Sequence, residues 1–474
     1  MAATGERAKS GHCTSLRICF PKNSTRMKMQ SHRIDRRRFL GSTSALAAIC
    51  ASRWSRADDL PQVVNPRATS GDQRFEPDWK KRLTITVGPE KADVAGSTDK
   101  AIQAAVDYVA RLGGGSVKVL PGVYRCRNSI FLPSGIRIVG SGLDSVLEKE
   151  ASVATTLAED SDWYDQEIVL ADAQGFQLGD GVFLTKPDSS DGGPVALKRT
   201  LVARSGNRFK LDRPLRKNLW LKADPTCASL FPLFSGENIE NVVIEKLAFD
   251  GNRANNDNLN GNYGGCIWLQ DCNRMTLRDL TLRNYNGDGI SWQVCHDVVV
   301  HRCHSHDNAD LGLHPGSGSQ RPLIRDNKLH RNGIGIFWCW GVKFGLAENN
   351  SIVSSRNYGI SIGHNDTDNV MRNNEVIGSG KVGVLFRDDS RGKDFWPNRN
   401  LLENNRIIDS GAKEGIAIDV QGKTKDISIS SNEIRETRQA AQRIGIRLGA
   451  ETSNINQVDN VISGFATAVH DLRS

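Results

Sequence analysis

Residues 289–292 read Gly-Ile-Ser-Trp, and this pattern of a small residue followed by alternating apolar positions returns throughout the second half of the chain. The segments that carry it are Cys266-Ile267-Trp268-Leu269, Gly289-Ile290-Ser291-Trp292, Gly312-Leu313-His314-Pro315, Gly335-Ile336-Phe337-Trp338, Gly359-Ile360-Ser361-Ile362, Gly383-Val384-Leu385-Phe386, Gly415-Ile416-Ala417-Ile418 and Gly445-Ile446-Arg447-Leu448. The step between successive segments is nearly constant up to Gly383 and becomes wider after it. A near-constant period of this size indicates a repeat architecture.

A second series runs in step with the first and consists of asparagines, each two residues before an apolar residue. Its members are Asn327, Asn350, Asn374, Asn405, Asn432 and Asn460. Asparagine tolerates the left-handed backbone that a sharp turn needs. Stacked Asn amides can also hydrogen-bond from one repeat to the next.

One short strand per ~23 residues cannot bury its own apolar face, but stacked copies can, because each strand pairs with its neighbour at ~4.8 Å. The leucine-rich consensus of the rival solenoid is missing from these 474 residues. The sequence therefore predicts an all-β fold, a parallel β-helix, and the right-handed form follows from the usual hand of crossovers between parallel strands.

The segment before the repeats predicts a short N-terminal capping helix. Ser97 or Thr98 begins it, apolar residues fall on one face, and the glycines at 113–115 end it. Strands are expected at 116–120, 130–132 and 136–139. Three blocks, Thr98-Asp99-Lys100-Ala101-Ile102-Gln103-Ala104-Ala105, Gly113-Gly114-Gly115 and Leu120-Pro121-Gly122-Val123-Tyr124, resemble the N-terminal cap of the pectate-lyase superfamily.

Residues 151–235 interrupt the repeat. Stretches at 175–182 and 208–211 are expected to be strands of a small β subdomain inserted early in the helix. The expected organisation is a leader over 1–57, the cap and first coils over 58–150, the insertion over 151–235 and the repeats over 236–474.

The leader holds the positive charge. Residues 1–57 contain twelve Lys/Arg and two Asp/Glu, so the remaining 50 basic and 52 acidic residues give a net charge of −2. Arg36-Arg37-Arg38-Phe39-Leu40, followed by an apolar stretch and Ser55-Arg56-Ala57, resembles a twin-arginine export signal. The true start is expected at Met27 or Met29. The resemblance implies a periplasmic or extracellular protein without a membrane anchor after cleavage. The net charge of −2 beyond the leader argues against nucleic-acid partners. A monomer is expected.

Alternation along the repeated strands sorts side chains into inward and outward sets. Ser291, His314, Phe337, Ser361 and Leu385 are expected to point outward in one row, which Trp268 extends. Such a row can bind an extended polymer, and outward aromatic rings suit sugar faces. The substrate-binding candidates are Trp268, Phe337, Trp340, His364, Arg387 and Asp388.

Two blocks, Asn286-Gly287-Asp288 and Asn308-Ala309-Asp310-Leu311, resemble the active-site blocks of polygalacturonase-type glycoside hydrolases. The resemblance implies hydrolysis by Asp288 and Asp310 as acid and base, assisted by His314. Leu311 stands where that family has a second aspartate, and Tyr358 or Ile334 where it has histidine.

Gly312-Leu313-His314-Pro315-Gly316 is similar to a strand block of alginate-type C5-epimerases and related lyases, with His in place of Asp and Gly in place of His. This second resemblance implies proton abstraction beside a uronate carboxylate. His314 would be the base, and Arg387 would neutralise the carboxylate by a bidentate contact.

No cofactor is required, although His364-Asn365-Asp366 and Asp388-Asp389 offer possible Ca²⁺ ligands. His301, His304 and His306 are expected to pack rather than to bind zinc. Cys272 and Cys295 occupy the same repeat position and can be either buried thiols or a disulfide, with thiols favoured.

The sequence thus favours an exported enzyme that cleaves glycosidic bonds of an acidic polysaccharide. The alternatives are a lyase or C5-epimerase, and a non-catalytic glycan-binding or surface-structural β-helix, because this fold hosts all three.

Overall fold

The computed structural model describes residues 61, 76–187, 195–411, 415–438 and 442–473. The predicted export signal and both candidate start positions lie outside this part of the chain. Among the described residues, no helix is both long and apolar enough to cross a membrane.

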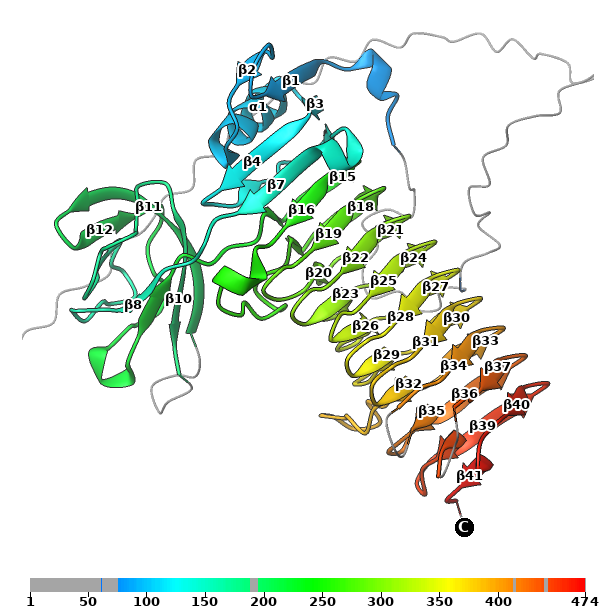
Figure 1. Cartoon of the computed structure of the whole chain (residues 1–474). Coiled ribbons are helices and arrows are strands. Elements are labelled where there is room, and N and C mark those ends of the chain that lie inside the picture. Colours follow the sequence, from blue (N-terminus) through cyan, green and yellow to red (C-terminus); the bar gives the residue numbers. More distant parts are fainter. Residues whose placement is uncertain (1–60, 62–75, 188–194, 412–414, 439–441, 474) are drawn as a thin grey trace, which may run out of the picture. The chain divides into compact units, whose positions relative to one another are not determined.

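Three long parallel sheets make up most of the structure, and the predicted right-handed parallel β-helix is confirmed (Figure 1). The first sheet contains β2 (Val94–Ala95), β1 (Thr84–Gly88), β3 (Gly115–Val119), β6 (Ile136–Val139), β15 (Glu240–Glu245), β18 (Asn273–Arg278), β21 (Val299–His301), β24 (Leu323–Arg325), β27 (Leu346–Glu348), β30 (Val370–Arg372), β33 (Leu401–Glu403), β36 (Lys425–Ser430) and β39 (Ser453–Val458).

The second sheet contains β4 (Gly122–Cys126), β7 (Ser145–Lys149), β16 (Ala248–Asp250), β19 (Thr281–Arg283), β22 (His304–His306), β25 (Lys328–His330), β28 (Ser351–Val353), β31 (Glu375–Ile377), β34 (Arg406–Ile408), β37 (Glu433–Arg435) and β40 (Val461–Ser463). The third sheet contains β5 (Ile130–Phe131), β14 (Phe234–Glu237), β17 (Ile267–Gln270), β20 (Ile290–Gln293), β23 (Leu311–Gly316), β26 (Ile334–Phe337), β29 (Tyr358–Ile362), β32 (Val382–Phe386), β35 (Ile416–Val420), β38 (Ile444–Leu448) and β41 (Thr467–Asp471).

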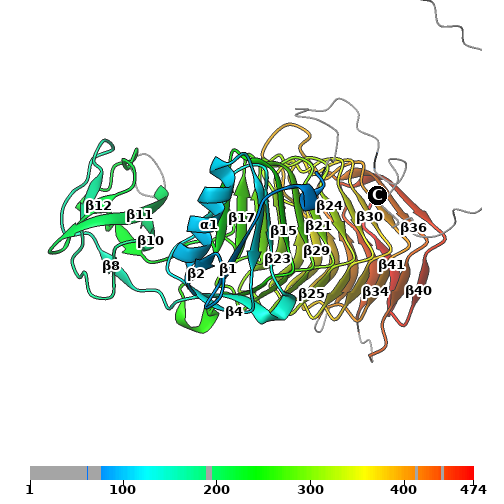
Figure 2. The same ribbon diagram turned by 90° about the horizontal axis from the view of Figure 1, so that it is seen from above.

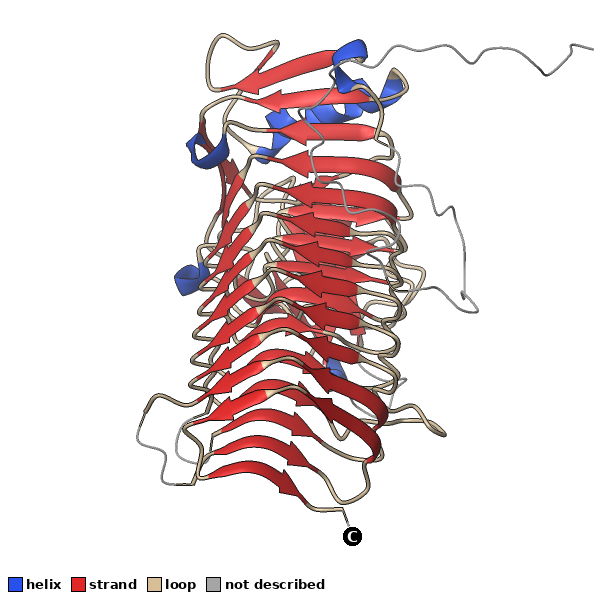
Figure 3. Cartoon of the chain, turned by 90° about the vertical axis from the view of Figure 1, so that its right-hand side faces the viewer, coloured by secondary structure: helices blue, strands red, loops and turns tan. Residues whose placement is uncertain are grey.

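Each coil contributes one strand to each sheet, as β17, β18 and β19 do before β20, β21 and β22 begin the next coil (Figure 3). The inward side chains are apolar and form one continuous core. Trp292 and Trp338 lie in this core with no exposed surface. Burial against neighbouring coils, rather than any one strand's own contacts, therefore stabilises the fold.

Helix α1 (Asp99–Arg111) lies at the N-terminal end of the coils, where the cap was expected (Figure 2). Its buried face includes Ile102, Val106 and Val109, which join the main core. The chain leaves the helix through Gly114, which has φ +97° and whose added Cβ would lie 2.3 Å from the carbonyl oxygen of Gly135. Only glycine fits this exit, because of both the backbone conformation and the close approach.

The predicted asparagine ladder is confirmed. Each Nδ2 group donates to the Oδ1 atom of the next member, at 2.9 Å from Asn327 to Asn350 and 2.8 Å from Asn350 to Asn374. The expected left-handed backbone, however, belongs to the residue before each ladder position, for example Asn349 with φ +56° and Asn373 with φ +54°. The turn is made one residue earlier, which leaves the ladder side chain free to point inward.

A separate six-stranded sheet is formed by the insertion. It contains β8 (Ala154–Thr156), β13 (Thr226–Ala228), β10 (Gly181–Lys186), β11 (Val195–Ser205), β12 (Arg208–Leu211) and β9 (Glu167–Val169). The strand predicted at 208–211 is present, but the one predicted at 175–182 is mostly a turn, because Gly175 and Gly179 have φ +86° and +97°. Arg127, which follows β4, pairs with Asp180 of the insertion at 2.7 Å.

Lys149, at the end of β7, is completely buried. Its ammonium contacts Asn256 Oδ1 and lies 4.4 Å from the ring centre of Phe231. Burial lowers the pKa of Lys149 to about 7, far below the value of about 10.4 in an unfolded chain. Between these two pH values the unfolded chain binds a proton that the folded protein does not.

The free energy of unfolding of the wild type should fall as the pH falls from 10 to 7, whereas that of Lys149→Met should not. Over this range we expect the variant to become more stable relative to the wild type by about 4 kcal/mol. Below pH 7 both states bind the proton, and the difference should become constant. Urea unfolding of both proteins across this range measures the effect. Lys118→Met, at an exposed position on β3, is the control. A wild-type-to-variant difference that does not change with pH would contradict the assignment.

Candidate functional site

The outward row predicted for the third sheet is present. Trp268 pairs in register with Ser291, and Ser291 with His314. Further along, Phe337 pairs with Ser361 and Ser361 with Leu385. The imidazole ring of His314 and the ring of Phe337 join the two halves, with centroids 5.5 Å apart.

His314 of the row forms a buried carboxylate–imidazole pair with Asp288, which lies two residues before β20. Asp288 Oδ2 lies 2.8 Å from His314 Nδ1, and Asp288 Oδ1 accepts the backbone N–H of Leu311 at 3.0 Å. Asp288 has no exposed surface, and His314 is 4% exposed. Burial raises the pKa of the Asp288 carboxyl, while its hydrogen bond to His314 opposes that rise. We call Asp288 and His314 the dyad.

The loop over residues 251–266, between β16 and β17, closes around the dyad. Ser291 Oγ donates to the carbonyl oxygen of Gly261 at 2.6 Å and lies 3.4 Å from His314 Nδ1. A Cβ at Gly261 would lie 1.7 Å from Asp288 Oδ2, so any side chain there would displace the carboxylate. Sequence reasoning missed Ser291 and Gly261 as site residues. The sequence did hold one sign of this loop. The separation along the chain between Phe234 and its register partner Ile267 is wider than the regular step of the coils that follow, which indicates a long loop at this coil.

The second ring nitrogen of the dyad histidine is unused. Among the described residues, His314 Nε2 is buried and has no hydrogen-bond partner. With Asp288 ionised, Nδ1 must carry the proton, because a carboxylate only accepts. In the neutral imidazole Nε2 is then a free acceptor, and an unpaired buried acceptor costs about 1–3 kcal/mol. Such a nitrogen is suited to receive a proton from a bound substrate.

Asp310 lies outside the dyad. Its Oδ2 accepts a hydrogen bond from Asn258 Nδ2 at 2.8 Å, and its side chain is partly exposed. The expectation that Asp288 and Asp310 face one open groove as acid and base does not fit this arrangement. The physical reason is that both carboxylate oxygens of Asp288 are engaged, Oδ2 with His314 and Oδ1 with the backbone N–H of Leu311, while Asp310 is bound to Asn258.

Arg387 lies beyond Phe337 on the same face. Its guanidinium carbon stands 4.3 Å from the ring centre of Phe337, and its N–H groups donate to Ser361 Oγ at 2.8 Å and to the carbonyl oxygen of Trp338 at 3.0 Å. Asp366 and Asp389 lie 3.8 and 3.9 Å away. Two of its five N–H groups are engaged in these hydrogen bonds, and Asp366 and Asp389 face the guanidinium as counter-ions, so a ligand carboxylate would share it with them.

An aromatic cluster made of Trp340, His364 and Phe395 lies beyond Arg387. The rings of Trp340 and His364 lie 5.2 Å apart, and His364 and Phe395 5.4 Å apart. Arg391 stacks on Trp340 at 4.3 Å, and its backbone N–H donates to His364 Nδ1 at 2.8 Å. The loop after β32 therefore packs on this end of the row. Trp340 is 40% exposed and Phe395 is 42% exposed, so both present apolar surface to solvent.

Trp268 is a correction. It belongs to the row but is only 2% exposed, because Lys198 of the insertion lies over it with Nζ 2.7 Å from the ring centre. The face expected to stack on a sugar is therefore covered. The prediction failed because the covering group comes from β11, a strand of the insertion that lies far earlier in the chain than β17.

Asp366 is held by the backbone rather than presented to solvent. It accepts N–H groups from Gly341, Val342 and Gly363, all at 2.9 Å, and burial raises its pKa to about 6. This carboxylate therefore stabilises a turn, and its expected role as a Ca²⁺ ligand does not fit. Asp388 remains exposed beside Gln421, whose Oε1 accepts its backbone N–H at 3.4 Å.

The other polar candidates have packing roles. His304 stacks on His306 at 4.1 Å and meets His330 at 5.1 Å, on the outer face of the second sheet. His301 binds Asp326 at 3.0 Å. Cys272 and Cys295 stack on successive coils as free thiols, with the backbone N–H of Cys272 3.4 Å from Cys295 Sγ.

The repeats match a known protein family over part of the chain. The matching family is described as "Right handed beta helix region". It covers residues 235–398.

Two comparisons show similarity to mannuronan C5-epimerases. The chain is 27% identical over 188 residues to AlgE5 of Azotobacter vinelandii, which is 39% of this chain and 16% of that protein. The chain thus spans about a sixth of the length of that relative. The solved A-module of AlgE4 from the same organism is 15% identical, covers 79% of this chain and 95% of its own, and has a TM-score of 0.50.

A third similar structure has a different description. PfbA, a surface adhesin of Streptococcus pneumoniae, is 12% identical, covers 78% of this chain and 88% of its own, and has a TM-score of 0.49. At 15% identity, the likeness to the AlgE4 A-module shows the parallel β-helix fold alone.

Proposed function

We propose that this protein is an enzyme acting on an acidic polysaccharide, and that it removes the C5 proton of a uronate residue. The observation that carries the proposal is the dyad, whose histidine keeps Nε2 free while Asp288 holds Nδ1 at 2.8 Å. The partial similarity to mannuronan C5-epimerases supports the same substrate class.

The step is a general-base reaction. His314 Nε2 takes the proton from C5, and the electron pair of the broken C–H bond moves into the adjacent carboxylate to form an enediolate. If water supplies a proton to C5 from the opposite face, the residue is epimerised, and the proton taken by His314 passes to solvent. If the pair instead expels the oxygen at C4, the chain is cleaved by elimination. We favour epimerisation, because the relatives with detectable sequence similarity are epimerases.

The roles of the other groups follow from their positions. Asp288 is a positioning residue that fixes the ring of His314 and stabilises the imidazolium as it forms. Arg387 supplies positive charge for the enediolate, since it stacks on Phe337, the neighbour of His314 in the row. Phe337 and the exposed ring of Trp340 offer surfaces for sugar faces.

Hydrolysis has less support. A pair of carboxyl groups must flank the scissile bond, whereas both oxygens of Asp288 are hydrogen-bonded, to His314 and to the backbone N–H of Leu311, and Asp310 binds Asn258. Asp388 and His364 are retained as substrate contacts, since they lie beside Arg387 and Trp340 respectively.

Export by the twin-arginine pathway and action outside the cytoplasm are part of the proposal.

The test is an incubation of the purified protein with polymannuronate and polygalacturonate in D₂O. We expect deuterium at C5 by NMR, without ultraviolet absorbance from unsaturated uronate. Deuterium together with absorbance would indicate a lyase that uses the same base. New reducing ends without either signal would identify a hydrolase and overturn the proposal. Neutral cellulose oligomers serve as the negative control.

A further inference from the structure

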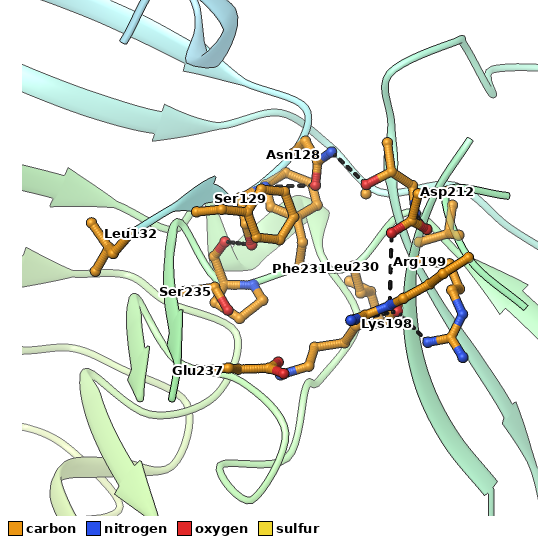
Figure 4. Close-up of a pocket in the computed structure, with 16 residues that line it drawn as sticks. Asn128, Ser129, Leu132, Lys198, Arg199, Asp212, Leu230, Phe231, Ser235 and Glu237 are labelled. Carbon is orange, nitrogen blue, oxygen red and sulfur yellow. Dashed lines mark hydrogen bonds and ion pairs between the residues drawn. The ribbon is translucent and has the colours of Figure 1, made fainter. Parts of the chain in front are cut away.

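A cavity of about 290 Å³ lies between the insertion and the first coils (Figure 4). Its apolar lining comes from the coil side and includes Phe131, Phe231 and Pro232. Its polar lining comes largely from β11 of the insertion and the turn after β12. A size near 300 Å³ with an apolar floor and a few polar groups is typical of a small-ligand site.

The charged groups around the cavity have an excess of cations. The lining includes Lys198, Arg199 and Arg213 against two carboxylates, Asp212 and Glu237. Arg213 Nε is 3.7 Å from Asp212. Arg199 donates to the carbonyl oxygens of Lys198, Pro214 and Leu215. Because carbonyl oxygens carry no net charge, the positive charge of Arg199 is left without a counter-ion among these contacts.

Among the cations that line the cavity, Lys198 contacts a residue of the row, Trp268. Its Nζ is buried, makes no hydrogen bond among the described residues, and faces Glu237 Oε1 at 3.5 Å (Figure 4). The same nitrogen covers the ring of Trp268. The ammonium therefore has unused donors at the cavity wall, and burial lowers its pKa to about 7. An anionic ligand would satisfy those donors and offset the cost of burying the charge.

The cavity lies along the same row as the dyad. Ser235, which lines it, pairs in register with Trp268, two further coils before His314. Three coil steps of ~4.8 Å place Ser235 about 14 Å from the dyad along the stack. Trp268 and Ser291, which lie between them, are covered by Lys198 and by the loop over residues 251–266, so one polymer chain that reaches both places runs over the outside of these covering groups.

We infer that this cavity is a subsite for one carboxylated sugar residue of the polymer, with Lys198 as the group that binds the carboxylate. This inference rests on the proposed function and extends it, because it makes the insertion part of the substrate-binding surface. The sugar ring packs against the apolar floor. Its carboxylate forms an ion pair with the Lys198 ammonium in place of the ion pair that Glu237 makes.

Calorimetric titration with mannuronate hexamer, galacturonate hexamer and neutral cellohexaose tests this subsite. We expect Lys198→Met to weaken binding of at least one uronate hexamer tenfold or more. Glu237→Gln should strengthen it about threefold, because the ammonium is released. Lys210→Met, at an exposed position on β12 of the same sheet, is the matched control and should bind within twofold of wild type.

The two variants are expected to change the affinity for uronate hexamers in opposite directions. If Lys198→Met fails to fold, the inference is still tested, because Glu237→Gln must strengthen binding. Equal affinity of Lys198→Met and Lys210→Met for the hexamers would overturn the subsite and leave the proposed function standing. Cellohexaose binding as tightly as the uronate hexamers would overturn charge recognition. If no uronate hexamer bound to the wild type, both the subsite and the proposed function would fail.

Discussion

His314→Gln will lower the rate of deuterium incorporation at C5 by about 100- to 10,000-fold, the usual contribution of a general base. Glutamine keeps the approximate size of the side chain but cannot take the proton. The affinity for uronate hexamers should change little, since the loss lies in the chemical step. His301→Gln, on the outer side of the first sheet, is the matched control and should retain full activity.

The variant Asp288→Asn distinguishes a positioning role of Asp288 in the reaction from a purely structural role. It removes the anion that stabilises the imidazolium, so the acidic limb of the pH–rate profile should move to lower pH as the rate falls. A purely structural defect would lower the rate at every pH without moving the limb. Full activity in His314→Gln would overturn the assignment of the base.

Asn374→Ala will lower the free energy of unfolding by about 3–5 kcal/mol, because it leaves several buried polar groups unpaired. Asn374 Nδ2 donates to Asn405 Oδ1 and to the carbonyl oxygen of Ala347, both at 3.0 Å. Its Oδ1 accepts the backbone and side-chain N–H groups of Asn350 at 3.0 and 2.8 Å. All four hydrogen bonds are lost in the variant.

The neighbouring residue offers a close control. Asn373 is exposed and has φ +54°, so Asn373→Gly keeps the turn and should change the unfolding free energy by less than about 1 kcal/mol. Urea unfolding of both variants gives the comparison. Equal stabilities would mean that the ladder contributes no more than a surface amide.

The β-helix could be predicted because its signal is repeated. The near-constant step between repeats determines which residue of one coil lies beside which residue of the next, and the register from Trp268 to Ser291 and His314 follows directly. Alternation then separates the core residue Trp292 from the outward residue Ser291. The asparagine ladder was accessible for the same reason.

The site was only partly predictable, because its decisive contacts are not periodic. The separation of Asp288 and His314 along the chain is slightly longer than one coil step, so the spacing gave no sign that they touch. The loop that brings Gly261 against them and the insertion that places Lys198 over Trp268 depend on long-range packing. The sequence assigned Asp288 and Asp310 to one acid–base pair, although a one-residue offset in the repeat separates them and only Asp288 is enclosed.

The stacking of coils also has a consequence for how this protein folds. Since nearly every strand of the three sheets pairs with strands one coil away, the loop that must close before each pairing is about the same length along the repeats. The entropy cost of closing the loop is then about the same for each added coil. Folding can therefore proceed from one coil to the next, as in a one-dimensional lattice. This cost rises most at the inserted sheet, and it also rises at the step that carries the dyad loop and at the wider steps around and after Gly383, so propagation along the lattice slows at these three places.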